Sequence, residues 1–407
     1  MVEKYNFNAV AVRDYYPTYE NPGNSLWVYE QIIGLMKFGI SSFVISPTPY
    51  IPNFIRKYKQ FYLYPHHSKA IENYKGTYVV RPPFLKLPSK YFTNLNLYFQ
   101  KKLILKYSKN FNPKLIHAHF GRNGVASIPL KNKYNIPLIT SFYGDDVGIN
   151  KHAKRLKKLY KELIVCGDLF LALSLDMKND LINIGFPEEK IIVHHLGIDL
   201  SLFNMNNNGS FKEKDKVIIC CIGRFHEYKG GQDTILAFSR LTKEFENVEL
   251  RIIGDGPYIP KMELLCREKN IENKVIFINN FKSKDPRSVV LNEIKNCDIF
   301  ILTPFMDNSG VKTGTPVVLM EAQAFGKPCI STNYAGIPEV LDFGNSGILV
   351  EQRNIDQIYE ALKLLCYNED RRILYGKRGR QYIEQEFNQE IQMEKLAQIY
   401  HSLINKG

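Results

Sequence analysis

An arginine and a lysine follow an apolar run in the second half of the chain, at a spacing suited to binding an anion. The stretch Cys221–Gly231 reads CIGRFHEYKGG and places Arg224 five residues before Lys229. A guanidinium binds two oxygens at once and an ammonium adds a point charge, so the pair suits a diphosphate. Gly223 leaves the backbone open, and the glycines after Lys229 lead into a helix start, itself an anion site. The alternative is an exposed basic loop without a ligand.

A second stretch, residues 313–332, reads TGTPVVLMEAQAFGKPCIST and has the pattern of a helix start beside a ligand. Gly314 permits close backbone approach, Thr315 is expected to cap the helix, and Pro316 is expected at its first position. The unpaired N–H groups of such a start bind phosphate or sugar oxygens. Glu321 follows inside the helix, where its carboxylate suits a ribose diol. The alternative for Glu321 is a solvated helix glutamate.

A glycine turn between a strand and a helix marks a third stretch, Arg251–Leu265 (RIIGDGPYIPKMELL), which contains Gly254. Such turns are common in nucleotide-binding sheets. The glycines also fit a turn that has no ligand.

Three polar loops follow apolar runs in the first half. They are Asn21–Ser25 with Gly23 and Asn24, His117–Gly121 with His119, and Phe142–Val147 with Tyr143, Asp145 and Asp146. His117 and His119 share one face of a strand, but no carboxylate or cysteine stands at ligand spacing, so we expect no metal site. We place Asn24 and His119 on the side of an acceptor. Tyr143 and Asp146 are candidate catalytic residues; the alternative is that the aspartates only stabilise a turn.

Short apolar runs precede these polar stretches and predict the elements that position them. FNAVAVRDYYP, the glycine-closed helix LWVYEQIIGLMKFG and ISSFVISP form a strand–helix–strand unit, which favours a parallel sheet. The alternation of short apolar runs with helical stretches begins again after the polar stretch Asn204–Lys216. We therefore predict two doubly wound parallel-sheet α/β domains, residues 1–197 and 198–385, followed by a helical tail at 386–407. Ligands bind such sheets at the carboxyl ends of the strands.

Composition is that of a globular protein with two domains. The 407 residues exceed one ordinary core, and 44% of them are hydrophobic. No apolar run is long enough to span a membrane, and the N-terminus lacks a signal-peptide pattern, so we expect a soluble cytoplasmic protein. The seven cysteines are scattered without a CxxC pair, which indicates reduced thiols.

All of the excess positive charge lies in the first half. Residues 1–199 hold 27 Lys and Arg against 14 Asp and Glu, whereas residues 200–407 hold 27 of each. The basic stretches Phe54–His67 and Lys151–Ile164 contribute to this excess. An anionic partner is expected: a membrane surface, a phosphorylated acceptor or nucleic acid. The second basic stretch is either an ordinary packed helix or an interfacial helix on anionic lipid. No nucleic-acid-binding signature accompanies these stretches, so we expect no nucleic acid.

The motifs together resemble a known family. IGRFHEYKG, IIGDGPY, GTPVVLMEAQAFGKPCIST and AGIPEV, in this order, are similar to the donor domain of retaining glycosyltransferases of family 4. HAHFG, SFYGDDV and HHLGIDLSLF resemble that family's first domain and hinge. The resemblance covers most of the chain, is more specific in the second half, and is closest to bacterial polysaccharide and lipopolysaccharide transferases. It implies the GT-B fold, in which two Rossmann-like domains face a cleft and the tail helix returns to the first domain.

The resemblance also implies an activity. A nucleotide-diphosphate sugar, UDP- or GDP-linked, would give its sugar to a glycan or lipid-linked glycan with retention at the anomeric carbon, on the inner face of the membrane. Arg224 and Lys229 match the diphosphate pair, Glu321 matches the ribose glutamate, and Gly23 matches a loop near the phosphates. Neither a metal nor a cofactor is implied. Alternatives are an epimerase or phosphorylase of the same fold, or a nucleotide-sugar-binding protein with impaired catalysis.

Two positions depart from the family pattern. Thr313 stands where the family has the first glutamate of its E-x7-E motif, and Tyr143 stands where it has a histidine. The family residues at both positions contact the donor sugar or lie beside it. Threonine and tyrosine still form hydrogen bonds but carry no charge, so the departures bear on which sugar is bound. Asp307, in the loop before Thr313, is our candidate to compensate.

Overall fold

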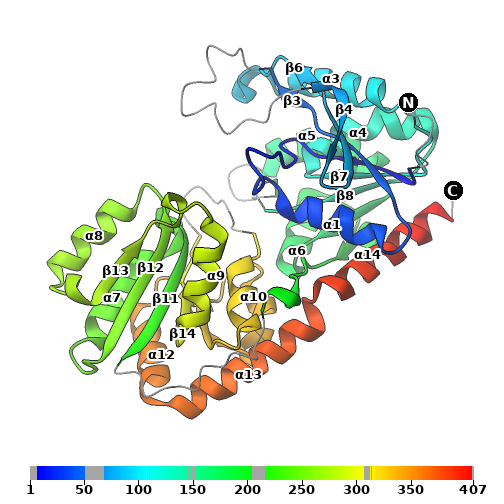
Figure 1. Ribbon diagram of the computed structural model, residues 1–407. Helices are drawn as coiled ribbons and strands as arrows, with labels where there is room; N and C mark the ends of the chain where they lie inside the picture. The colour runs from blue at the N-terminus through cyan, green and yellow to red at the C-terminus, as the bar shows by residue number, and fades with distance from the viewer. Residues whose placement is uncertain are drawn as a thin grey trace. The chain divides into compact units, whose positions relative to one another are not determined.

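The computed structural model describes residues 7–50, 68–109, 111–144, 146–147, 153–203, 216–306, 312 and 314–405. The chain forms two compact units (Figure 1). The first unit holds residues 1–173, 177–196 and 392–407, and the second holds residues 174–176 and 197–391. Within the described ranges, no helix is both long and apolar enough to cross a membrane.

The first unit is built on an eight-stranded sheet with the order β10-β9-β8-β7-β1-β2-β5-β4. Its strands are β1 (Ala9–Val12), β2 (Ser42–Ile45), β4 (Ser68–Tyr74), β5 (Thr77–Arg81), β7 (Leu115–His119), β8 (Leu138–Ser141), β9 (Leu169–Ala172) and β10 (Ile191–Val193). All pairs are parallel except β4 with β5 at one edge. A separate two-stranded sheet joins β3 (Thr48–Pro49) to β6 (Pro83–Phe84). The four central strands of the larger sheet, β8, β7, β1 and β2, are short and wholly buried, as a parallel sheet covered on both faces requires.

Helices cover both faces of this first sheet. They are α1 (Leu26–Met36), α3 (Ser89–Tyr107), α4 (Gly121–Tyr134), α5 (Ala153–Cys166), α6 (Leu175–Ile184) and α14 (Gln389–Ile404). The core on one face takes its buried side chains from α3, α4, α5 and α6. Cores on the other face take theirs from α1 and α14. Residues 392–407 of the tail therefore help to bury the first sheet.

The second unit contains a six-stranded sheet, all parallel, with the order β13-β12-β11-β14-β15-β16. Its strands are β11 (Val217–Arg224), β12 (Val248–Asp255), β13 (Val275–Ile278), β14 (Ile299–Leu302), β15 (Cys329–Thr332) and β16 (Ile348–Val350). Alternate residues of one strand enter opposite cores, since Ile219 and Cys221 of β11 belong to one core and Cys220 and Ile222 to the other.

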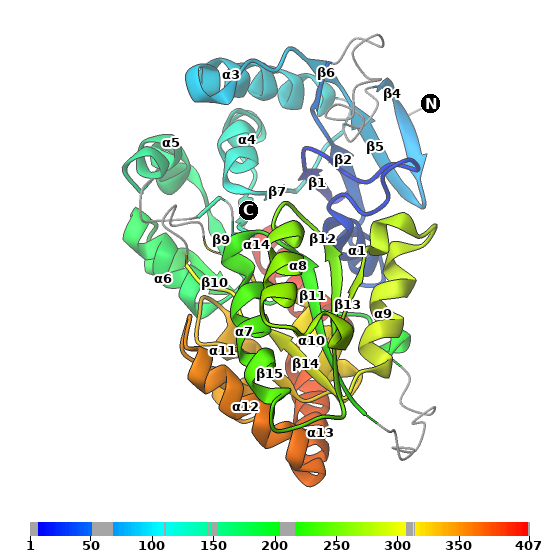
Figure 2. The ribbon, with the colours of Figure 1, turned by 90° about the vertical axis from the view of Figure 1, so that its left-hand side faces the viewer.

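Helices also cover both faces of the second sheet. They are α7 (Gly231–Leu241), α8 (Ile259–Glu268), α9 (Pro286–Asn296), α10 (Val317–Ala324), α11 (Ile337–Val340), α12 (Ile355–Tyr367) and α13 (Glu369–Glu386). Side chains of α7, α8 and α12 fill one core, and those of α9, α10, α11 and α13 fill the other. Figure 2 looks from the side of α7 and α8 and shows them in front of the sheet. The predicted fold class, two doubly wound parallel-sheet domains, is confirmed.

The helical tail predicted at 386–407 is interrupted near its start. A break at Phe387 and Asn388 separates α13 from α14. At the break the backbone of Ile198 donates to the carbonyl of Phe387 at 2.8 Å and accepts from the N–H of Gln389 at 3.0 Å. Gly197 permits this approach, because a Cβ there would lie 2.4 Å from the Cα of Gln389. Backbone pairing with a distant segment thus replaces one turn of helix.

The compact units divide between Leu196 and Gly197, and the tail joins the first unit from Gln392 onward. The roles that we assign to the two domains, acceptor binding and donor binding, stay predictions.

Candidate donor site and its neighbours

The carboxyl ends of β11 and β12 lie side by side at one edge of the second sheet. Arg224, the last residue of β11, is in register with Asp255 of β12, and Gly223 is in register with Gly254. Gly254 has a φ of 141°, and a Cβ there would lie 1.9 Å from the carbonyl oxygen of Gly223. Packing therefore explains Gly254. At Gly223 a Cβ would meet nothing within 4 Å, so this glycine leaves open space at the strand end.

Two cationic side chains lie on the connection from β11 to α7. The Arg224 side chain is exposed and makes no hydrogen bond or ion pair with any residue that the structure describes. Lys229 ends a short 3-10 helix (Glu227–Lys229), and its Nζ lies 5.5 Å from the centre of the Tyr228 ring. Gly230 then serves as the N-cap of α7 without a side-chain cap. This connection combines positive charge with uncapped N–H groups, an arrangement that favours a bound anion.

The end of β14 fixes this connection, a role that the sequence did not reveal. The Thr303 hydroxyl donates to the carbonyl of Gly230 at 2.9 Å, and the backbone N–H of Phe305 donates to the carbonyl of Tyr228 at 2.9 Å. Gly230 has a φ of 73°, and a Cβ there would lie 1.7 Å from the Thr303 carbonyl oxygen. The loop carrying Lys229 is thus held by backbone contacts that require a glycine.

The start of α10 lies one residue later than the sequence predicted. Pro316 is the N-cap, in an extended conformation, and Val317 is the first helical residue. Thr315 therefore does not cap the helix, and no side chain does. The Thr315 Oγ1 is buried and lacks a hydrogen-bond partner among the described residues. Gly314 precedes it in the loop, whereas Thr313 and Asp307 lie outside the described residues.

Glu321 is fully buried inside α10, which rules out a solvated surface glutamate. Arg287 of α9 forms an ion pair with it, with Nη1 2.5 Å from Oε1, yet neither carboxylate oxygen has a hydrogen bond of good geometry in the described part of the chain. Burial raises the pKa of Glu321, and the charge of Arg287 opposes that shift. The sequence did not reveal Arg287, because no local pattern links it to a carboxylate in another helix.

In the first unit, His119 and Tyr143 form one hydrogen-bonded pair. The Tyr143 hydroxyl lies 2.7 Å from His119 Nδ1, whereas His119 Nε2 is buried without a partner in the described residues. Burial lowers the pKa of His119 and raises that of Tyr143, so both groups are neutral at neutral pH. The Trp27 ring lies 5.8 Å from that of Tyr143, and its Nε1 also lacks a described partner. This cluster can form neutral hydrogen bonds but does not carry positive charge.

The neighbouring histidine is structural. His117 Nδ1 lies 2.7 Å from the Tyr400 hydroxyl and its Nε2 lies 2.7 Å from the Ser141 hydroxyl. Burial lowers the pKa of His117 to about 3. Its ring therefore ties α14 to the sheet as a neutral group.

Asp146 organises the loop after β8. Its carboxylate accepts the backbone N–H groups of Gly121, Tyr143 and Gly144 at 2.9, 3.0 and 3.1 Å. Burial raises its pKa, and these hydrogen bonds oppose that shift. Asp146 thus holds Tyr143 and the first turn of α4, which makes it a positioning residue. Asp145 lies outside the described residues.

The glycine loop after β1 is the other predicted feature of this unit. Gly23 is exposed with open space around it, and the backbone N–H of Asn24 donates to the carbonyl of Asn21 at 3.3 Å. The structure shows a surface turn here. Among the described residues, no group of three or more His, Cys, Asp or Glu side chains is placed to hold a metal ion.

Comparison with known proteins gives the family. The model described as "Glycosyl transferases group 1" matches residues 204–382, and that described as "Glycosyltransferase Family 4" matches residues 21–202. The chain is 29% identical to a putative colanic acid biosynthesis glycosyltransferase, WcaL, of Escherichia coli K12, over 72% of this chain and 71% of that protein. It is 28% identical to the amylovoran biosynthesis glycosyltransferase AmsK of Erwinia amylovora, over 74% and 73% of the two chains.

Solved structures agree on the fold. A glycosyltransferase from Rickettsia africae aligns with a TM-score of 0.75 at 19% identity, over 99% of this chain and 100% of that one. HepE of Anabaena, in complex with UDP, aligns with a TM-score of 0.73 at 14% identity, over 98% and 100%. With two family models that together span residues 21–382 apart from one position, the chain belongs to the glycosyltransferases of the GT-B fold, family 4-like.

Proposed function

We propose that the protein is a retaining, metal-independent hexosyltransferase. It takes a UDP- or GDP-linked sugar and transfers the sugar to a glycan or lipid-linked glycan in the synthesis of a surface polysaccharide. The observation that carries the proposal is the connection from β11 to α7, where Arg224 and Lys229 accompany an uncapped helix start at the carboxyl edge of a parallel sheet. WcaL and AmsK, named for colanic acid and amylovoran biosynthesis, support the polysaccharide.

The chemistry assigned to this connection is stabilisation of the leaving group. Negative charge grows on the nucleotide diphosphate as the bond from its oxygen to the anomeric carbon breaks. Arg224 and Lys229 would meet that charge, and each donor of this kind is worth about 3 kcal/mol in the transition state. No metal is then needed to neutralise the diphosphate. The fold also suits a uridine nucleotide, since HepE has been solved with UDP and with UDP-glucose.

Glu321 is assigned to the ribose of the nucleotide. Its two oxygens lack well-oriented hydrogen bonds in the described part of the chain, so they can accept two ribose hydroxyls. The backbone at the end of β11 and just before α10 would line the donor. The residues assigned there are Gly223, Gly314, Thr315 and Pro316.

His119, Tyr143 and Thr313 are assigned to the sugar and its acceptor. His119 Nε2 and Trp27 Nε1 are buried without described partners and could bond to sugar hydroxyls. Tyr143 is held by Asp146 and offers a neutral hydroxyl where the family pattern has a histidine. Gly23 is assigned to the donor phosphates and Asn24 to the acceptor, and both lie on a surface loop of the first unit. The basic first half is assigned to an anionic membrane surface on the cytoplasmic side.

Incubation with a panel of UDP- and GDP-sugars and a lipid-extract acceptor tests the proposal. We expect acceptor-dependent release of UDP or GDP from one donor, at an unchanged rate when EDTA is added. Donor consumption without an acceptor would instead indicate an epimerase or phosphorylase. Nucleotide binding without turnover on any acceptor would indicate a binding protein. The absence of both nucleotide binding and turnover would contradict the proposal outright.

A further inference from the structure

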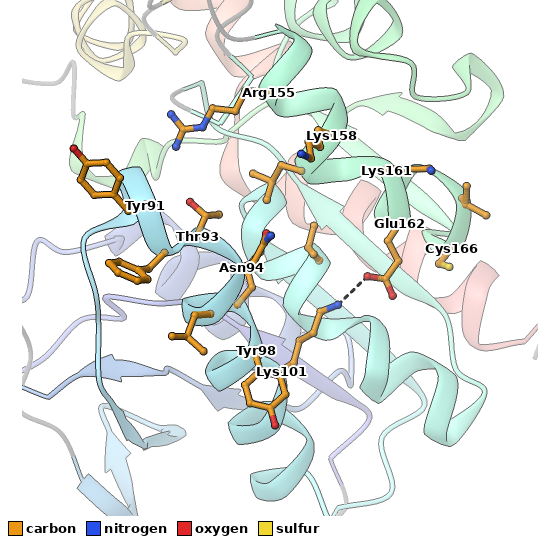
Figure 3. Close-up of a pocket in the computed structure, with 16 residues that line it drawn as sticks. Tyr91, Thr93, Asn94, Tyr98, Lys101, Arg155, Lys158, Lys161, Glu162 and Cys166 are labelled. Carbon is orange, nitrogen blue, oxygen red and sulfur yellow. Dashed lines mark hydrogen bonds and ion pairs between the residues drawn. The ribbon is translucent and has the colours of Figure 1, made fainter.

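We propose that a groove on the first unit binds the apolar chain and the phosphate of a lipid-linked acceptor. The inference rests on the proposed function and deepens it, because it names the acceptor class and the place that holds it. The groove lies between α3 and α5 and has a volume of about 980 Å³ (Figure 3). This is at the upper end of the ~300–1,000 Å³ usual for small-molecule sites.

Three helices build the groove. α3 and α5 each pack against α4, and Val125 of α4 lines the space between them. Lys101 of α3 and Glu162 of α5 form an ion pair at 2.8 Å that joins the two walls (Figure 3). The groove is therefore a feature of how this unit packs.

Several exposed apolar side chains gather in the groove. Tyr91, Phe92, Leu95 and Tyr98 of the α3 wall and Val165 of α5 all line the groove, and each is exposed, Tyr91 by 72% and Val165 by 73%. A concentration of exposed apolar surface on a soluble unit marks a binding site. The shape and lining suit a hydrocarbon chain.

The charges of the groove favour an anion. Arg155, Lys158 and Lys161 of α5 line it, are exposed, and make no ion pair with any described residue (Figure 3). Glu162 is the one carboxylate among the described residues of the lining, and it already forms an ion pair with Lys101. An apolar chain that carries a phosphate complements both properties, since the chain covers the aromatic wall and the phosphate meets the unpaired cations.

A second, smaller cavity adjoins the groove and indicates which way the polar end of the acceptor would lie. Its volume is about 60 Å³, and Thr93 and Leu97 line both cavities. Its lining also includes Asp14, which follows β1, and Arg122, in the first turn of α4. Asp14 and Arg122 place this cavity at the carboxyl edge of the sheet, so the polar end of the acceptor would leave the groove on this side. Simple contact of α5 with a bilayer would not require this second cavity.

Cys166 provides a reporter within the groove. It lines the groove and is the one cysteine of the seven that is not buried. The assay measures the rate of its alkylation by iodoacetamide, read by peptide mass spectrometry, with dodecyl phosphate below its micellar concentration. We expect saturating dodecyl phosphate to slow alkylation about tenfold. Inorganic phosphate and the uncharged dodecyl maltoside, at equal concentrations, should slow it less than about twofold.

Charge variants assign the effect to the groove. In the double variant Arg155→Glu and Lys158→Glu, half-protection should need at least about ten times more dodecyl phosphate. Lys157→Glu, on the same helix but outside the groove lining, makes a matched control that should protect like the wild type. Each variant is compared with its own rate without ligand, because nearby charge alters thiol reactivity.

Three results would overturn the proposal. Dodecyl maltoside could protect Cys166 from alkylation as well as dodecyl phosphate does, or the double variant could be protected like the wild type. The third result is that phosphatidylglycerol vesicles protect Cys166 and dodecyl phosphate does not. The last would assign α5 to a membrane surface without a chain-binding groove. The assay needs neither donor nor turnover, so a result against the groove would not count against the proposed sugar transfer. Conversely, a lack of turnover would not affect the binding result.

Discussion

Replacing Arg224 with alanine is expected to lower kcat/KM for sugar transfer by about a hundredfold or more, and Lys229→Ala should have an effect of the same order. Each side chain is assigned one interaction with the charge that develops on the diphosphate, worth about 3 kcal/mol. The loss should fall mainly on kcat, because that charge is greatest in the transition state. Initial rates at varied donor concentration measure both parameters.

The control is Arg267→Ala, which removes another exposed arginine of the same unit, on α8. Its kcat/KM should stay within about twofold of the wild type, as for most surface changes. The double variant Arg224→Ala and Lys229→Ala should lose less than the product of the single losses, because both residues act on one group. Rates equal to the wild type in both single variants would remove these residues from the mechanism.

Replacing Arg287 with alanine is expected to lower the free energy of unfolding by about 2 kcal/mol at neutral pH. Arg287 forms an ion pair with Glu321, whose side chain is 0% exposed. Removing one partner of a buried pair costs ~3–5 kcal/mol, and we reduce that figure because Arg287 itself is 47% exposed. Denaturant unfolding followed by a signal from the second unit measures the change.

The loss should depend on pH in a definite direction. Burial already raises the pKa of Glu321, and Arg287 opposes that shift, so its removal raises the pKa further. A carboxyl group whose pKa is raised by folding stabilises the fold below its unfolded pKa and loses that contribution as pH rises through the folded value. The deficit of Arg287→Ala should therefore be small in acid and largest at neutral pH.

A second substitution isolates the cause. Glu321→Gln removes the buried charge, so the double variant with Arg287→Ala should recover most of the lost stability and lose the pH dependence. Glu321→Gln alone should weaken donor binding, since the ribose loses an ionised acceptor. A deficit that is equal in acid and at neutral pH, or that persists in the double variant, would show that packing and not charge explains Arg287.

Much of the fold was predictable because buried parallel strands appear in the sequence as short apolar runs. Runs such as VIICCIGR and IFIL are buried along most of their length, so their apolar character is nearly continuous and their ends are sharp. The break at Phe387 was not predictable, because it depends on backbone pairing with Ile198, far away in the sequence. The edge strand β4 has a mostly exposed, polar sequence, SKAIENY, and left no comparable signal.

The position of Gly223, Arg224 and Lys229 at and after the end of a strand was predictable, because glycine and charge follow an apolar run there. It was not predictable where a partner comes from another element. Arg287 meets Glu321 only through the packing of α9 on α10, and Thr303 meets Gly230 only through the pairing of β14 with β11. The cap of α10 was placed one residue early because Thr315 and Pro316 suit a helix start, whereas the backbone at Pro316 is still extended.

The central claim is transfer of a sugar with retention, and proton NMR of the product tests it most directly. The donor identified by nucleotide release is mixed with acceptor and enzyme, and the coupling constant of the anomeric proton of the new glycoside is recorded. We predict a new glycoside with the anomeric configuration of the donor sugar. A glycoside of the opposite configuration would contradict the retaining mechanism, and free sugar as the only product would contradict the transfer.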